Sequence, residues 1–374
     1  MKIGITCYPT YGGSGVVATE LGKILADMGN EVHFISYALP YRLNSFSSQL
    51  FYHEVEVLQY PLFEYPPYSL SLASKMSEVI EYQNLDIMHV HYAIPHATSA
   101  YLAKQMLPKR DLKYVTTLHG TDITLLGGDP SFFKITKFSI EESSGITAVS
   151  KFLRDKTYDV FRTTSEIEVI PNFVPFDITK IINKPELREC FAKNDEFIIT
   201  HISNFRPLKR VTDIVPILKK VIGDFKIKML MVGDGPERSK MEEQCRAERL
   251  CDNVIFLGKQ ENISDILSIT DIVLIPSETE SFGLVALEAL ACGVPCVSTN
   301  AGGLPEVNRN GETGFTRDVG DIDGLAEAIL TILSDRELAR KMGKAGRKIA
   351  LNNFSADKIV PKYIQYYEKV LGSR

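Results

Sequence analysis

The stretch KIGITCYPTYGGSGVVATELGKILADMG, residues 2–29, contains the pattern that decides the fold. Residues 2–9 are mostly apolar and predict a strand, and residues 13–29 have the apolar spacing of a helix that ends at Gly29. In the turn between them, Gly13, Gly15 and Ala18 have the spacing of a dinucleotide-binding loop. A strand, a glycine turn and a helix in this order predict the first unit of a parallel sheet covered by helices.

The same alternation continues along the chain. Apolar runs rich in β-branched residues predict strands at 32–37, 86–93, 113–119 and 145–150, with a helix at 71–83. A proline-containing segment at 167–177 is typical of a linker, and strand-like runs follow at 196–205, 226–235, 253–258, 271–277 and 295–300. We predict an α/β fold of two Rossmann-like domains that face each other across a cleft. The predicted domains are residues 1–172 and 173–356, with a C-terminal helix at about 357–374 that packs back on the first.

The composition narrows the function classes. The 374 residues are 44% hydrophobic and 24% charged, which is typical of a globular protein. Because no apolar run is long enough to span a membrane and the N-terminus lacks a signal-peptide pattern, we expect a cytoplasmic protein without stable membrane association. The net charge of −5, without a long basic block, disfavours nucleic acid as a partner. The six scattered cysteines lack zinc-finger spacing and are expected to be thiols, mostly buried. Whether the chain forms a homo-oligomer is left open.

The first glycine loop is suited to an anion. Glycines let the backbone approach a phosphate, and the N-terminus of the following helix favours negative charge. A nicotinamide-binding domain also needs an acidic residue after its second strand, and the corresponding segment, VHFISYALP at 32–40, contains none. This disfavours a dehydrogenase and leaves two interpretations, an anion contact and a tight turn without a ligand.

A basic cluster follows the first strand of the second domain. Arg206, Lys209 and Arg210 lie at the carboxyl end of the strand, where ligands of open α/β sheets bind. Such side chains neutralise a diphosphate, although Arg210 is the one we expect to be merely solvated.

The segment SETESFGLVALEALACGVP, residues 277–295, contains two glutamates eight residues apart. A helix that begins near Ser281 or Phe282 and runs to Cys292 would separate Glu280 and Glu288 by roughly 12 Å. That exceeds the roughly 5–9.5 Å between the two carboxylates of a glycosidase. A helix N-terminus with free N–H groups at 282–284 thus lies between two carboxylates. Carboxylates accept hydrogen bonds from hydroxyls and N–H groups donate to phosphates, so this order matches the sugar, diphosphate and ribose of a nucleotide sugar. The other interpretation is a surface helix with solvated glutamates, which the apolar residues between them disfavour.

With these motifs the sequence resembles the retaining GT-B glycosyltransferases, especially glycosyltransferase family 4. Segments in the order typical of that family are GGSG, LHGTD, IPNFV, SNFRPLK, VGDGP, FLGKQ, ETESFGLVALE and AGGLPEVNRNGETGF, and they cover nearly the whole chain. A finer resemblance, carried by CYPTYGGSGVVATELG, HVHYAIPHA, LHGTDITLLG and SNFRPLKR, is to the members that begin bacillithiol biosynthesis. It implies transfer of GlcNAc from UDP-GlcNAc to the hydroxyl of L-malate with retention of the α configuration.

The resemblance also implies roles for individual residues. On the donor side, Glu280 would bind sugar hydroxyls, Glu288 the ribose, and Arg206 and Lys209 the diphosphate. The remaining donor contacts would come from Ser14, Gly15, Asn172, Asn204, Lys259, Gln260, Ser281, Phe282, Gly283 and Leu284. Asn204 stands where many relatives have an arginine, so Arg206 would have to supply the guanidinium from another position.

The acceptor is expected to bind the first domain, where four of the seven histidines (89, 91, 96 and 119) lie in or after predicted strands. A single histidine is more often structural than functional, but His119 precedes a glycine turn at a strand end. The expected acceptor contacts are Ser14, Tyr92, Thr117, His119 and Arg154. We expect no cofactor and no metal, because no Asp-x-Asp motif stands at a strand end and Asp321 is typical of a helix cap.

The sequence alone leaves three other functions open. A family member with a different acceptor would use inositol phosphate, a lipid or a polysaccharide end, although the chain has no strongly basic amphipathic surface for lipid. A nicotinamide-dependent dehydrogenase is the second. A sensor that binds a nucleotide sugar without releasing UDP is the third.

Overall fold

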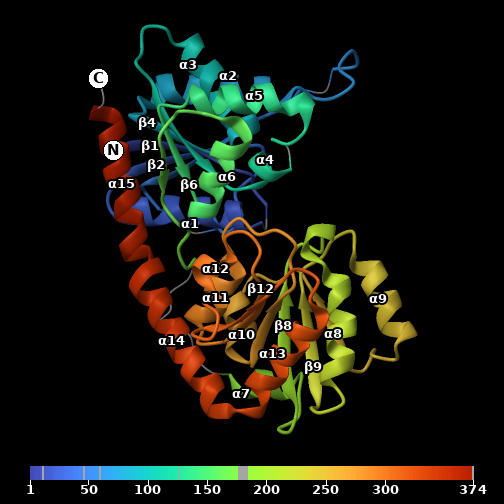
Figure 1. The fold of residues 1–374 in the computed structure, drawn as a ribbon. Coiled ribbons are helices and arrows are strands. Elements are labelled where there is room, and N and C mark those ends of the chain that lie inside the picture. The colour runs from blue at the N-terminus through green and yellow to red at the C-terminus, as the bar shows by residue number, and fades with distance from the viewer. Residues whose placement is uncertain (11, 45–46, 59, 126, 176–183, 373–374) are drawn as a thin grey trace. The chain divides into compact units, whose positions relative to one another are not determined.

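The computed structural model describes residues 1–374 except 11, 45–46, 59, 126, 176–183 and 373–374 (Figure 1). The chain divides into two compact units. Unit 1 comprises Met1–Pro175 together with Ala356–Arg374, and unit 2 comprises Phe176–Ser355.

Unit 1 is built on a parallel sheet of seven strands in the order β3-β2-β1-β4-β5-β6-β7. The strands are β1 (Lys2–Thr6), β2 (Glu31–Ser36), β3 (Leu50–Glu54), β4 (Ile87–His91), β5 (Lys113–Leu118), β6 (Gly145–Ala148) and β7 (Ile167–Val169). The central strands β1 and β4 pair directly, Ile3 with Ile87 and Ile5 with His89. Because both faces of a parallel sheet are covered by helices, the central strands are buried along nearly their whole length.

Helices cover the sheet of unit 1, among them those predicted at 13–29, 71–83 and about 357–374. They are α1 (Gly13–Asp27), α2 (Tyr68–Gln83), α3 (Thr98–Met106), α4 (Thr121–Thr124), α5 (Pro130–Glu141), α6 (Lys151–Phe161) and α15 (Ala356–Gly372), with a short π-helical turn at Ala93–Ala97. Helix α1 ends at Asp27, two residues before Gly29, whose φ of 87° is typical of the residue after a helix cap. Helix α15, drawn in red in Figure 1, belongs to this unit although it is the last element of the chain.

Two strands of this sheet are absent from the sequence-based prediction. Residues 167–169 form the edge strand β7, so the segment interpreted as a linker begins inside the sheet. The strand is only three residues long, too short for a recognisable alternation, and prolines follow it directly. Strand β3, at the other edge, is at most half-buried, so it lacks the apolar run of an interior strand.

Unit 2 repeats the doubly wound plan with six parallel strands in the order β10-β9-β8-β11-β12-β13. The strands are β8 (Phe197–Ile202), β9 (Ile227–Val232), β10 (Val254–Gly258), β11 (Ile272–Ile275), β12 (Cys296–Thr299) and β13 (Gly314–Arg317), the last not predicted from sequence. The helices are α7 (Pro185–Glu189), α8 (Ile214–Val221), α9 (Arg238–Ala247), α10 (Ile263–Ser268), α11 (Leu284–Ala291), α12 (Leu304–Val307), α13 (Ile322–Ser334) and α14 (Arg336–Phe354). Asp321 caps α13 by accepting a hydrogen bond of 2.8 Å from the Gly324 N–H, as predicted.

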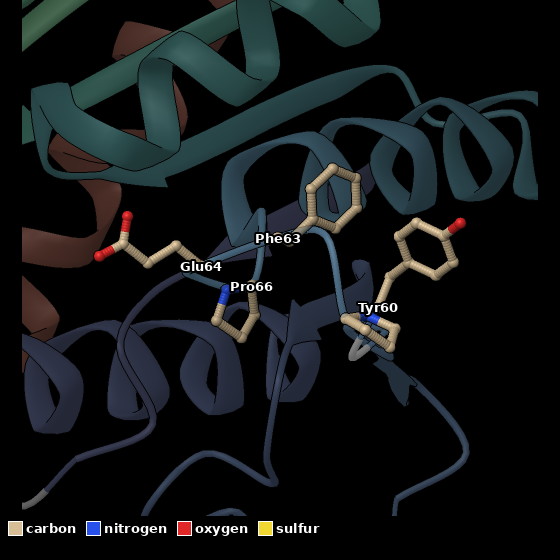
Figure 2. A pocket seen from close by; sticks show the side chains of 5 residues that line it. Tyr60, Phe63, Glu64 and Pro66 are labelled. Carbon is tan, nitrogen blue, oxygen red and sulfur yellow. The ribbon is translucent and has the colours of Figure 1, made fainter.

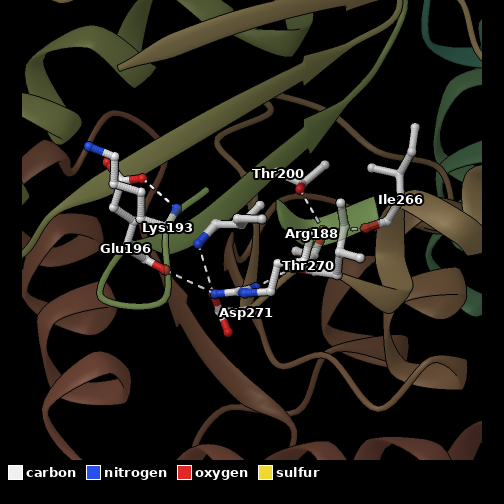
Figure 3. A network of polar contacts seen from close by, with 9 residues as sticks. Arg188, Lys193, Glu196, Thr200, Ile266, Thr270 and Asp271 are labelled. Atoms are coloured by element: carbon white, nitrogen blue, oxygen red, sulfur yellow. Dashed lines mark hydrogen bonds and ion pairs between the residues drawn. The ribbon is translucent and has the colours of Figure 1, made fainter. Parts of the chain in front are cut away.

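A polar network joins α7 to the amino-terminal ends of the central strands of unit 2 (Figure 3). The Arg188 guanidinium donates to Asp271 Oδ2 at 2.8 Å and to the carbonyls of Ile269 at 2.6 Å and Glu196 at 3.0 Å. Asp271 Oδ2 also accepts from the Ile198 N–H at 2.7 Å. One arginine therefore holds the starts of β8 and β11 together, at the end of the strands opposite to the predicted site residues.

Candidate functional site

In each unit two of the predicted site residues meet where the strand order reverses, Ser14 with Tyr92 and Lys209 with Glu280. The chain of unit 1 runs from β1 toward one edge and then returns to β4, so β1 and β4 are neighbours that lead away in opposite directions. Unit 2 reverses in the same way between β8 and β11. Loops that leave the carboxyl ends of two such strands diverge and open a crevice, which is where open α/β sheets bind ligands.

In unit 1, the loops after β1 and β4 meet through side chains. The hydroxyls of Ser14 and Tyr92 lie 2.8 Å apart, although the residues are 78 positions apart in the sequence. Tyr92 has a φ of 87°, a rare conformation for a tyrosine, and its N–H donates to the Thr117 carbonyl at 2.9 Å. The structure thus brings together Ser14, Tyr92 and the end of β5.

The backbone at Gly15 packs tightly against the loop that follows β1. A Cβ on Gly15 would lie 2.6 Å from the Tyr8 carbonyl oxygen and 2.7 Å from that of Thr10. Only glycine fits there, and the Gly15 packing therefore fixes where α1 starts. Among the residues that the structure describes, the N–H groups of Ser14 and Gly15 have no backbone acceptor, as an anion site at this helix end requires.

Four histidines of unit 1 lie in β4 or directly after β4 and β5; His89, His91 and His96 are buried, and His119 is partly exposed. His91 Nδ1 lies 2.8 Å from His119 Nε2, and the ring of His119 is 5.2 Å from that of Tyr92. Burial lowers the pKa of His89 to about 3, of His96 to about 4 and of His119 to about 3, and it lowers the pKa of His91 well below its ordinary value. All four rings are therefore neutral at pH 7 and serve as hydrogen-bonding groups, not as cations for a carboxylate.

Three other residues predicted for unit 1, Thr117, Arg154 and Asn172, differ in their surroundings. The Thr117 hydroxyl is fully buried and lies 2.6 Å from both His89 Nε2 and the Thr147 hydroxyl, so it faces the interior. The acceptor contact expected of Thr117 stays a prediction, and in this structure its hydroxyl is engaged by His89 and Thr147. Arg154, in the first turn of α6, forms an ion pair of 2.8 Å with Asp155. Asn172 is 6% exposed, and its Oδ1 has no hydrogen-bond partner among the described residues.

In unit 2, the loops after β8 and β11 are joined by an ion pair. Lys209 Nζ donates to Glu280 Oε1 at 2.5 Å across 71 positions of sequence. Ser277 donates to the same oxygen at 2.9 Å. The two charged side chains are 18% and 17% exposed, and the other carboxylate oxygen, Oε2, has no partner among the described residues. The carboxylate is therefore held at one oxygen while the other remains available.

Helix α11 begins later than the sequence predicts, at Leu284 instead of Ser281 or Phe282. Gly283 takes a φ of 94°, and a Cβ there would lie 2.7 Å from Leu304 Cδ2. This left-handed residue delays the helix, so the rise per residue of a helix does not give the separation of Glu280 and Glu288. The N–H groups of 282–284 donate to no carbonyl among the described residues, which leaves the donors that we predicted at this helix end.

The remaining residues predicted for the donor differ in exposure. Phe282 is 3% exposed and its ring packs on that of Phe354, 5.7 Å away, so only its backbone is placed for a ligand. Glu288 is buried on α11 with 6% exposure. Arg206, Asn204, Lys259 and Gln260 are exposed, and Gln260 donates to the Leu257 carbonyl at 2.7 Å. Arg210 forms an ion pair of 2.7 Å with Asp213, so it is not the solvated side chain that we predicted.

Three polar residues that the sequence analysis did not select support these sites. His201 Nδ1 donates to the Leu274 carbonyl at 2.9 Å, so its neutral Nε2 accepts from the Ser203 hydroxyl at 2.8 Å, which fixes the turn before Arg206. Buried Asp122 accepts from the N–H groups of Ala93 and Gly120, each at 2.9 Å. Ser277 is the third, through its bond to Glu280. A polar residue inside an apolar strand or directly after a glycine turn is the only signal that the sequence offers for them.

Other features of the molecule stand apart from these residues. Tyr60, Pro61, Phe63, Glu64 and Pro66 line a pocket of about 380 Å³ in the segment between β3 and α2 (Figure 2). None of the predicted site residues lines it. Within the described ranges, no group of three or more histidine, cysteine or acidic side chains is placed to hold a metal ion. The helices that the structure describes are all too short or too polar to cross a membrane.

Known proteins resemble both halves of the chain. Residues 11–177 match the family model described as Glycosyltransferase Family 4, and residues 183–349 match the model described as Glycosyl transferases group 1. The N-acetyl-alpha-D-glucosaminyl L-malate synthase of Bacillus anthracis is 49% identical over 99% of this chain and 97% of its own. Among solved structures, a sucrose-phosphate synthase from Thermosynechococcus elongatus has a TM-score of 0.85 at 21% identity and covers 100% of both chains. A glycosyltransferase from Rickettsia africae has a TM-score of 0.80 at 24% identity, over 100% of this chain and 99% of its own.

Proposed function

The chain belongs to glycosyltransferase family 4 and has the two Rossmann-like domains of the GT-B fold, and on that premise we propose that it transfers GlcNAc from UDP-GlcNAc to L-malate. The products would be N-acetyl-α-D-glucosaminyl L-malate and UDP, the first step of bacillithiol biosynthesis. The observation that carries the proposal is the 49% identity to the Bacillus anthracis synthase, which extends over 99% of the chain.

The diphosphate of the donor would bind at the strand reversal of unit 2. An ammonium group has three N–H donors, and Lys209 uses one of them on Glu280, which leaves two for phosphate oxygens. The exposed guanidinium of Arg206 and the N–H groups at 282–284 add further donors. Groups of this kind stabilise the negative charge that develops on departing UDP, an effect often worth about 3 kcal/mol for a single donor.

Glu280 would bind the sugar. Lys209 and Ser277 both donate to its Oε1, so the carboxylate cannot rotate freely, and its Oε2 remains to accept from sugar hydroxyls. We assign Glu280 no role as a nucleophile or general base, because its Oε1 is held by Lys209 and Ser277 and its Oε2 is assigned to the sugar hydroxyls. Glu288, buried on α11, is the candidate for the ribose hydroxyls.

The acceptor would bind near Ser14, Tyr92 and His119 in unit 1. The malate hydroxyl forms a bond to the anomeric carbon as the bond from that carbon to the UDP oxygen breaks, and its proton passes to a phosphate oxygen. Attack from the face that UDP leaves retains the α configuration without a protein nucleophile. The histidines are neutral, so they supply hydrogen bonds, and positive charge for the malate carboxylates must come from arginine or lysine side chains such as Arg154.

We further propose that the reaction needs no metal ion, because Arg206, Lys209 and helix N–H groups are available for the diphosphate charge. Addition of EDTA should leave the rate of UDP release unchanged. Loss of activity with EDTA and recovery with Mg²⁺ would contradict this part of the proposal.

UDP release from UDP-GlcNAc with and without L-malate tests the function. We expect release that depends on malate, and a product whose mass equals that of GlcNAc joined to malate, with an α anomeric proton in its NMR spectrum. Inositol phosphate and glycan acceptors serve as controls. Malate-independent release, or release only with another acceptor, would show that the acceptor has been misassigned.

A further inference from the structure

The C-terminal helix of unit 1 inserts a hydrogen-bonding side chain beneath the predicted acceptor residues. Tyr367, on α15, is fully buried, and its hydroxyl lies 2.7 Å from His89 Nδ1 on β4. The residues are 278 positions apart in the sequence. Because a phenol hydroxyl is rarely buried without a partner, this contact defines where α15 docks on the sheet.

The chain of contacts continues from His89 toward the site. His89 Nε2 lies 2.6 Å from the Thr117 hydroxyl, which is itself 2.6 Å from the hydroxyl of Thr147 on β6. The carbonyl of the same Thr117 accepts the Tyr92 N–H at 2.9 Å. Tyr92 in turn contacts Ser14 through its own hydroxyl at 2.8 Å. Hydrogen bonds thus connect α15 to the Thr117 side chain, and the backbone of the same residue connects to Tyr92 at the carboxyl ends of β4 and β5.

The direction of this series is set by the neutral imidazole. A neutral ring donates through one nitrogen and accepts through the other, so its two hydroxyl partners hold it in one orientation. His89 is fully buried, so the loss of the Tyr367 hydroxyl would leave a ring nitrogen without a partner and free the ring to adopt other arrangements.

We propose that Tyr367 is a positioning residue for the acceptor: through His89 and Thr117 it holds Tyr92 in its left-handed conformation, where the hydroxyls of Tyr92 and Ser14 can bind the acceptor. This inference rests on the proposed function for the identity of the acceptor. Tyr367 touches no predicted substrate position and acts only through the two residues between.

The neighbouring tyrosine provides a matched control. Tyr366 lies on the same helix, and its hydroxyl accepts from the Ile146 N–H at 2.8 Å and donates to the Ile146 carbonyl at 3.0 Å. Tyr366→Phe therefore removes two hydrogen bonds between α15 and the sheet without touching His89 or Thr117. If α15 mattered only for stability, Tyr366→Phe would have at least as large an effect as Tyr367→Phe.

The first experiment compares steady-state kinetics of the full-length wild type, Tyr367→Phe and Tyr366→Phe. We expect Tyr367→Phe to raise KM for L-malate about tenfold, the factor for loss of roughly 1.4 kcal/mol of acceptor binding, with KM for UDP-GlcNAc unchanged. Tyr366→Phe should leave both KM values unchanged. Equal KM values for malate in all three proteins, with wild-type activity present, would overturn the inference and leave the proposed function intact.

The second experiment does not depend on the acceptor. Amide hydrogen exchange at Tyr92, followed in the free protein by mass spectrometry or NMR, reports the Tyr92–Thr117 hydrogen bond directly. We expect exchange about tenfold faster in Tyr367→Phe than in Tyr366→Phe. Identical exchange in the two variants would contradict the positioning role even if the wild type used an acceptor other than malate.

Discussion

Replacement of Glu280 by glutamine tests the proposed grip on the sugar. The change keeps the size of the side chain but removes its charge. Lys209 then loses the anion that it contacts at 2.5 Å, and the position of Oε2 presents a neutral oxygen or an NH2 group to the sugar. Ser277 keeps a polar partner, so the local backbone has no reason to rearrange.

The structure sets the expected size of the effect. A hydrogen bond to a charged group contributes about 1.5–3 kcal/mol, and each 1.4 kcal/mol is a factor of ten. We therefore expect kcat/KM for UDP-GlcNAc to fall about 10- to 150-fold. The Lys209–Glu280 pair is largely buried, at 18% and 17% exposure, and glutamine keeps an oxygen that can accept from Lys209, so the change should lower the free energy of unfolding by about 1–3 kcal/mol. The variant should remain folded at the assay temperature.

The assay is UDP release at saturating L-malate with UDP-GlcNAc varied. Glu278→Gln is the matched control, because Glu278 is exposed two residues away and its N–H donates to the Leu208 carbonyl, a contact that the substitution leaves intact. We expect wild-type kinetics from the control. If Glu280→Gln stayed within twofold of the wild-type kcat/KM, Glu280 would have no role in binding the sugar, and the ion pair would be purely structural.

Three further predictions concern stability and the helix turn. Arg188→Ala should lower the free energy of unfolding by about 3 kcal/mol, because it breaks a partly buried ion pair and two hydrogen bonds to carbonyls. An unchanged midpoint in a urea titration would show that Arg188 does not stabilise the starts of β8 and β11. Gly283→Ala should lower the free energy of unfolding by about 1–3 kcal/mol and weaken UDP-GlcNAc binding, because φ at Gly283 is 94° and Leu304 occupies the space of a Cβ. Calorimetry with and without UDP-GlcNAc measures the stability and the binding. An unchanged Tm would contradict the strain argument. Because burial lowers the pKa of His89 to about 3, the unfolded chain binds more protons than the folded one between pH 6.5 and about 3. The contribution of His89 to the free energy of unfolding is therefore fully present above pH 6.5 and is lost as pH falls, with a slope of up to about 1.4 kcal/mol per pH unit. Urea unfolding of wild type and His89→Gln from pH 7 to pH 5 measures this slope. Equal slopes in the two proteins would contradict a neutral buried ring.

Sequence alone determined the class of fold and the strand ends that carry polar residues. Alternating apolar runs and amphipathic helices are local patterns, and each is set by the residues of one element. The glycine turn at 12–15, the basic cluster after β8 and the acid pair around Gly283 could all be placed at carboxyl ends of strands in this way. Short edge strands such as β7 and β13 were missed, because three or four residues contain no measurable period.

Only the tertiary structure decided which of these residues meet. Lys209 pairs with Glu280, and Ser14 with Tyr92, because β8 lies beside β11 and β1 beside β4, an order that no local pattern encodes. Leu304, about twenty positions away, leaves no room for a Cβ at Gly283, the left-handed residue that precedes α11. The neutral state of His89 follows from its burial, to which Tyr367 of α15, the last helix of the chain, contributes, and the Thr117 hydroxyl points inward to that ring. Local sequence sets what each strand end carries, whereas long-range packing sets its partners, its protonation state and the direction in which it points.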